Sequence, residues 1–138
     1  MSPVVILPGH LCSERLYTHQ IAALARRTEV RVAQLYGHDS LPALGAAVLG
    51  ETQHPFTLIA NSMGGAVAFE VLRQDAARVQ ALVLIGTTCR AELPSQCERR
   101  SEALALVRSE DWDGLEKLYA PAFFSPDNRR SNPQLDVT

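Results

Sequence analysis

One serine, Ser62, lies where the sequence changes from a strand pattern to a helix pattern. Residues 56–59 form a short, apolar and partly β-branched run typical of a buried strand, and residues 63–72 are long enough for a buried helix. The chain must therefore turn sharply at Asn61 and Ser62, which leaves the serine hydroxyl clear of the sheet. The helix N-terminus behind it offers free N–H groups and a positive dipole end, which favour an oxygen anion nearby. This arrangement suits a serine oxygen that attacks a carbonyl carbon.

Small residues surround Ser62. Gly64, Gly65 and Ala66 leave room for the helix to pass close to the neighbouring strands. Ala60, Ser62 and Gly64 form the pattern Ala-x-Ser-x-Gly. This pattern resembles the nucleophile elbow Gly-x-Ser-x-Gly of the α/β-hydrolase family. Alanine stands in the place of the first glycine, so one extra methyl group must fit beside the turn.

The resemblance to α/β hydrolases extends well beyond the elbow. It is carried by Ile-Leu-Pro-Gly, Gly-His-Asp-Ser, Asn-Ser-Met-Gly-Gly-Ala-Val-Ala and Arg-Val-Gln-Ala-Leu-Val-Leu-Ile, in the family's order and spacing. It implies a partial α/β-hydrolase fold, with about four parallel strands and flanking helices over residues 1–90. Residues 91–138 resemble the start of a helical cap, followed by a tail. The chain is thus similar to the amino-terminal portion of an esterase-like serine hydrolase.

The resemblance also implies roles for individual residues. Ser62 is the catalytic nucleophile, and the backbone N–H of Met63 is one donor of the oxyanion hole. The second donor comes from the loop after the first strand, either His10 or Leu11. Pro8-Gly9-His10 is similar to the family's His-Gly-x motif with proline in the first place. Removing one such donor typically costs about 10²–10³ in turnover.

The base that would activate Ser62 is missing from the pattern. In this family the triad runs along the chain as serine, then aspartate or glutamate, then histidine. Every histidine precedes the serine: His10, His19, His38 and His54. The later aspartates fall in the helical region or the tail: Asp111, Asp113, Asp127 and Asp136. We therefore expect the triad acid and histidine to be absent from this chain, and the chain alone to be inactive.

The evidence for other chemistry at the loops around Ser62 is weaker. His10 would have to swing its ring onto the serine while its main chain forms the oxyanion wall, and a metal site at His10 and Cys12 has no second ligand pair. Thr87, Thr88 and Cys89 could line the pocket, but Cys89 has no identifiable activating base. The sequence predicts no cofactor and no metal.

Strands expected at residues 4–7, 30–35, 56–59 and 80–85 alternate with helices, which argues for a parallel, doubly wound sheet. The first two helices are capped by Ser13 and Ser40. Their inward stripes are expected to be Tyr17, Ile21, Leu24 and Ala25, and then Leu41, Leu44 and Val48. The loops at residues 8–10, 61–63 and 86–88 should converge at the carboxyl edge of the sheet, where ligands bind in such folds.

The pattern becomes helical after residue 90. A capping box, Ser95-x-x-Glu98, predicts a helix to about Arg108. Its inward side chains are expected to be Cys97, Leu104 and Val107, and a second helical face is marked by Trp112, Leu115, Leu118 and Tyr119. Residues 123–138 are rich in Pro, Asn, Asp, Ser and Arg, which favours a loop or a frayed terminus.

Composition narrows the class of protein. A chain of 138 residues with 46% hydrophobic content can bury the core of one domain. The formal charge of −2 and the scattered basic residues argue against nucleic acid as a partner. The three cysteines, at positions 12, 89 and 97, are an odd number in a chain without an export signal, which favours a reducing compartment. The opening residues lack a membrane-spanning run, so we expect a cytoplasmic protein without a membrane partner.

Three functions remain open. The first is hydrolysis of an ester or similar acyl bond in a small-molecule substrate, through a Ser62 acyl-enzyme. The second is a non-catalytic binding or interaction module, because the strand at 80–85 would keep an unpaired edge that invites self-association or a partner chain. The third keeps the fold and changes the chemistry, for example to acyl transfer, perhydrolysis or carbon–carbon bond hydrolysis.

Overall fold

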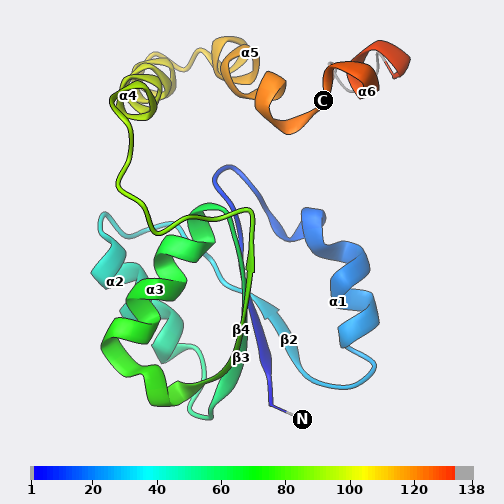
Figure 1. Ribbon diagram of the computed structural model, residues 1–138, viewed down its shortest axis with the longest axis vertical. Coiled ribbons are helices and arrows are strands. Elements are labelled where there is room, and N and C mark those ends of the chain that lie inside the picture. Colours follow the sequence, from blue (N-terminus) through cyan, green and yellow to red (C-terminus); the bar gives the residue numbers. More distant parts are fainter. Residues whose placement is uncertain (1, 133–138) are drawn as a thin grey trace. The chain divides into compact units, whose positions relative to one another are not determined.

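The computed structural model describes residues 2–132, apart from the side chain of Arg129. The chain divides into two compact units, Met1–Arg90 and Ala91–Thr138. The first is an α/β unit and the second is helical (Figure 1). No helix in the described part of the chain has the length and apolar composition needed to span a membrane.

The first unit is built on one parallel sheet with the strand order β2-β1-β3-β4 (Figure 1). Its strands are β1 (Val4–Leu7), β2 (Val30–Val32), β3 (Phe56–Asn61) and β4 (Val79–Ile85). The predicted parallel α/β architecture is therefore confirmed. Within the described residues β4 pairs only with β3, so it is an edge strand, as the sequence led us to expect.

The second strand is shorter than predicted. The sequence favours a strand over residues 30–35, but β2 ends at Val32. The Ala33 N–H still donates to the Ile6 carbonyl (2.9 Å). The next bond of this parallel ladder would need an N–H from Pro8, which has none. The strand therefore stops where its neighbour can no longer pair.

Helices cover both faces of the sheet (Figure 1). They are η1 (Glu14–Tyr17), α1 (Thr18–Leu24), α2 (Leu41–Gly50), α3 (Met63–Asp75) and η2 (Ala76–Arg78). Alternate residues of β1 serve the two sides: Val5 and Leu7 belong to the core under α2 and α3, and Ile6 belongs to the core with Tyr17. The predicted caps Ser13 and Ser40 both accept backbone hydrogen bonds.

Two residues predicted to face inward from the first two helices are exposed instead. Ala25 is exposed, although as the C-cap of α1 it continues the helical turn and its N–H donates to the Ile21 carbonyl (2.8 Å). Leu41 is 44% exposed at the first turn of α2, and the buried residues of that helix are Leu44, Gly45 and Val48.

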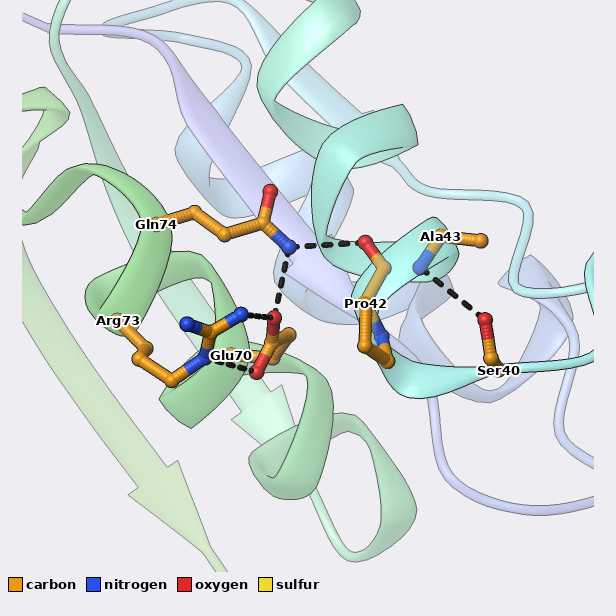
Figure 2. A network of polar contacts seen from close by, with 6 residues as sticks. All are labelled: Ser40, Pro42, Ala43, Glu70, Arg73 and Gln74. Atoms are coloured by element: carbon orange, nitrogen blue, oxygen red, sulfur yellow. Dashed lines mark hydrogen bonds and ion pairs between the residues drawn. The ribbon is translucent and has the colours of Figure 1, made fainter.

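A polar network joins α2 to α3 on the surface of the first unit (Figure 2). Glu70 accepts two hydrogen bonds from the Arg73 guanidinium (2.8 and 2.6 Å), and Gln74 Nε2 donates to Glu70 and to the Pro42 carbonyl (2.8 Å each). These bonds hold the pKa of Glu70 at about 2, below its ordinary 4.5. The helices approach closely here, since a Cβ added to Gly45 would lie 2.9 Å from both the Glu70 and the Gln74 side chains.

The second unit consists of α4 (Pro94–Arg108), α5 (Trp112–Phe123) and α6 (Pro126–Ser131). The helix α4 is capped two residues before the predicted capping box Ser95-x-x-Glu98. The N-cap of α4 is Leu93, whose N–H donates to the Gln96 side chain (2.8 Å). Pro94 explains the shift, because proline is well suited to the first helical position, where no N–H is needed.

The inward face of α4 also differs from the prediction. Cys97, Leu104 and Val107 are exposed. The side that faces α5 contains Arg99, Ala103 and Leu106, which recur at the i, i+4, i+7 spacing of one helical face. Arg99 donates to the Leu118 carbonyl (2.6 Å) and lies 5.2 Å from the centroid of the Tyr119 ring. Apolar periodicity missed this face because it is built from a small residue and the stem of an arginine.

The predicted apolar face of α5 is confirmed in part. Leu115, Leu118 and Tyr119 are partly buried, but Trp112 is 59% exposed at the first turn. The predicted loop after residue 123 contains the short helix α6, whose cap Ser125 accepts from the Asn128 N–H (3.2 Å). The remainder of that predicted loop, residues 133–138, lies outside the described residues.

Candidate active site

Ser62 occupies the turn between β3 and α3 in a strained backbone conformation. Its φ is 50° and its ψ is −115°, a region that residues with a side chain rarely adopt. The Ser62 N–H donates to the Ile85 carbonyl and its carbonyl accepts from the Gly65 N–H, both at 2.9 Å. These bonds hold the turn from both sides, and the serine is exposed. The strain is thus maintained by the surrounding structure, as at a nucleophile elbow.

The glycines after Ser62 allow α3 to pack directly against the sheet. A Cβ added to Gly64 would lie 2.3 Å from the Leu7 carbonyl oxygen, and one added to Gly65 would lie 2.0 Å from Thr87 Oγ1. Neither position accepts a side chain without movement. The alanine that replaces the first glycine of the elbow is tolerated, because Ala60 is fully buried with its methyl group in the core.

The loop after β1 meets the elbow. A Cβ added to Gly9 would lie 3.4 Å from Ser62 Cβ, which is van der Waals contact. Gly9 and Cys12 close a four-residue turn through a hydrogen bond from the Cys12 N–H to the Gly9 carbonyl (3.1 Å). Leu11 takes a left-handed conformation in this turn, with a φ of 57°, and its side chain is 58% exposed. The turn therefore presents backbone beside the serine.

The predicted oxyanion donors lie on the two sides of this contact. Met63 is the first residue of α3, where an N–H has no acceptor within the helix. His10, which is half-buried, and Leu11 are the two central residues of the Gly9–Cys12 turn. The fold brings these segments together around Ser62, and their role as donors stays a prediction.

A third loop reaches the same edge through Thr87, whose side chain lies against Gly65. Of its predicted pocket-lining neighbours, Thr88 accepts a hydrogen bond from the Arg90 N–H (3.1 Å), and Cys89 is exposed. The predicted convergence of three loops at the carboxyl ends of the strands is therefore confirmed for Gly9, Ser62 and Thr87.

The serine aminopeptidase S33 family model matches residues 9–116, which is most of the chain. The chain belongs to this family. It is an α/β-hydrolase family, so the resemblance drawn from the elbow and the strand order is confirmed. No curated protein matches the chain. Membership supports hydrolysis as the general activity of this protein.

Sequence patterns did not reveal the polar contacts of one buried residue beside the elbow. Tyr17 was expected only as an inward residue of the first helix, and it is indeed 5% exposed. Its hydroxyl accepts hydrogen bonds from the Gly9 N–H (3.3 Å) and from Asn61 Nδ2 (3.2 Å). Periodicity predicts that such a residue is buried, but it does not tell which polar atoms the hydroxyl meets.

The cysteine closest to the elbow is a poor nucleophile. Cys12 Sγ lies on the same side of Gly9 as Ser62, since a Cβ added to Gly9 would be 3.4 Å from Sγ as well. Burial raises the pKa of the Cys12 thiol above its ordinary value. Because the thiolate is the reactive form, Cys12 is held in its unreactive state at neutral pH.

The histidines of the chain are distributed around the first unit. His10 and His38 follow β1 and β2, His19 lies in α1, and His54 precedes β3. All but His10 are exposed. The site thus combines a strained, exposed serine with the start of α3 and the Gly9–Cys12 turn, and no base is assigned to it.

Proposed function

We propose that this member of the serine aminopeptidase S33 family is a serine hydrolase in which Ser62 attacks an ester or similar acyl bond of a small molecule. The observation that carries the proposal is the conformation of Ser62 at the N-terminus of α3, with the Gly9 loop packed opposite. A strained, solvent-facing serine at the start of a helix and beside a second loop serves no evident purpose in stability.

The chemistry follows from this geometry. Ser62 Oγ would form a bond to the substrate carbonyl carbon while its proton passes to a base, supplied either by His10 or by a partner chain. The negative charge on the carbonyl oxygen would be received by the N–H of Met63 and by that of His10 or Leu11. The leaving alcohol or amine would depart with the proton, and water would then release the acid and restore the serine hydroxyl.

Both esters and amides fit this scheme. The name of the family refers to aminopeptidases, which cleave amide bonds, and esters undergo the same acyl transfer with a better leaving group. We propose a small carboxylic ester as the first substrate class. Parallel assays with p-nitrophenyl acetate and with amino-acid p-nitroanilides distinguish the two.

The test of the nucleophile is a fluorophosphonate probe, which reacts covalently with activated serines. Trypsin releases Ser62 together with Ser40 in the peptide 32–73, so fragmentation of this peptide must place the adduct. An adduct on Ser62 that is lost in Ser62→Ala would mean that a base reaches this serine and that Ser62 is the nucleophile. Ser101→Ala, which changes an exposed serine of α4, is the matched control and should label like the unchanged protein.

A folded protein that leaves Ser62 unlabelled, or hydrolysis that persists in Ser62→Ala, would overturn the assignment. The first outcome would favour the second candidate function, a binding module. That candidate is supported by β4, which contains no charged residue and exposes Val83 (46%), Leu84 (41%) and Ile85 (48%) along an open edge. We propose a second copy of this chain as the partner, because it supplies an equally unpaired strand.

A further inference from the structure

We propose that Tyr17 is a positioning residue that fixes the loop after β1 against the nucleophile elbow. The proposal rests on the function proposed for Ser62. It comes from one hydroxyl that serves two segments: the Gly9 N–H, next to the predicted oxyanion donors, and the side chain of Asn61, next to the nucleophile. Tyr17 does not touch the reacting atoms in this scheme, and acts through Gly9 and Asn61.

The hydrogen-bond register explains why a side chain is needed at this point. In the ladder between β1 and β3, the Thr57 N–H donates to the Pro3 carbonyl. Donors then alternate between the strands at two-residue steps, so the continued ladder would direct the Gly9 N–H to the Asn61 carbonyl. The Gly9 N–H donates to Tyr17 instead. The hydroxyl thus replaces the next ladder carbonyl and lets the loop leave the direction of the strand.

The position of the Tyr17 ring makes the hydroxyl a fixed point. The ring belongs to the core cluster of Val4 and Ile6 and is 5% exposed. A tyrosine has only two side-chain torsions, so a buried ring holds its oxygen with little freedom. That oxygen accepts hydrogen bonds from both the Gly9 N–H and Asn61 Nδ2. Movement of the loop away from the elbow would therefore break a bond to a rigid anchor.

The separation that this anchor preserves is small. Only a Cβ added to Gly9 would reach ordinary contact with Ser62 Cβ, at 3.4 Å, so the loop lies about one methyl group from the elbow. Displacement of a catalytic group by 1 Å can cost about 10²-fold in rate. Without the Tyr17 hydroxyl, the Gly9–Cys12 turn would no longer be held in its position beside Ser62.

The experiment is Tyr17→Phe, which keeps the buried ring and removes the oxygen. Tyr36→Phe is the matched control, because Tyr36 is 70% exposed in the loop after β2. Two readouts are combined. Amide exchange by NMR reports on the Gly9 N–H directly, and the rate of fluorophosphonate labelling reports on Ser62. Hydrolysis of p-nitrophenyl acetate, where measurable, separates kcat from KM.

We expect Gly9 exchange to accelerate about tenfold in Tyr17→Phe, the factor given by loss of one hydrogen bond, while amides in the middle of α3 keep their rates. Labelling of Ser62 should slow by about tenfold or more, with the loss in kcat and not in KM. Tyr36→Phe should match the unchanged protein in both readouts.

Unchanged Gly9 exchange would overturn the proposal, as would equal acceleration of all amides, which indicates only lost stability. Local acceleration of Gly9 with unchanged labelling would also overturn it, because the loop would then not set the reactivity of Ser62. If the unchanged protein does not label at all, the function proposed for Ser62 fails. Gly9 exchange would still decide whether Tyr17 holds the loop.

Discussion

Replacement of Gly64 by alanine tests how closely α3 must approach β1 for the elbow to form. The added Cβ would lie 2.3 Å from the Leu7 carbonyl oxygen and 2.7 Å from the Leu7 carbonyl carbon. Ordinary contact begins near 3.4 Å, so the start of α3 must withdraw by 3.4 − 2.3, or about 1.1 Å. The obstructing atoms belong to a backbone inside the sheet and cannot rotate away.

The magnitude follows from two opposing effects. Overpacking in a core costs about 1–3 kcal/mol, and a rigid backbone obstacle favours the upper end of that range. Alanine recovers at most about 1 kcal/mol of helix propensity relative to glycine. We therefore expect Gly64→Ala to lower the free energy of unfolding by about 2 kcal/mol. Withdrawal of α3 by about 1 Å should also slow labelling of Ser62 by about 10²-fold.

The assay is a urea titration followed by circular dichroism, with Gly50→Ala as the control. Gly50 is the last residue of α2, and a Cβ added there would meet no atom within 4 Å. This control should unfold at the same urea concentration as the unchanged protein or slightly above it. If Gly64→Ala unfolds at the midpoint of Gly50→Ala, the close approach of α3 to β1 is refuted as a requirement of the fold.

Two further predictions concern the surface of the first unit. The lowered pKa of Glu70 means that its carboxylate stabilises the fold above about pH 4.5, and that this contribution is lost as the pH falls toward 2. Thermal unfolding of Glu70→Gln should therefore depend less on pH between these values, and an unchanged pH slope would contradict the role of the Arg73 and Gln74 contacts. At the open edge, Val83→Lys should reduce self-association in sedimentation velocity, whereas Leu41→Lys at the exposed first turn of α2 should not. A protein that is monomeric at all concentrations would exclude association through β4.

The elbow and the sheet could be predicted because their signals are local. A β-branched run, a serine and two adjacent glycines define the turn at Ser62 within a dozen residues, and the structure adds the reason that Gly64 and Gly65 carry no side chain. The end of β2 could not be predicted in this way. It depends on the missing N–H of Pro8, which directly follows another strand, β1.

The helices of the second unit mark the limit of apolar periodicity. That rule selected Leu104 and Val107 as the inward residues of α4, but the helix meets α5 through Arg99, Ala103 and Leu106. An alanine and an arginine stem do not register as a hydrophobic stripe, although both can be packed. The short helix α6 carried a readable signal, a serine cap followed by proline, which composition alone obscured.

The candidate site also explains why the two proposed functions must be measured together. The Ser62 N–H is bonded to the carbonyl of Ile85, the last residue of β4, so one side of the elbow depends on an edge strand. A strand that pairs with the open side of β4 would restrict the motion of Ile85 and, through this bond, of Ser62. Labelling of Ser62 that increases with protein concentration, and does so less in Val83→Lys, would therefore connect the edge to the nucleophile. Labelling independent of concentration would make the edge and the site separate features of the same sheet.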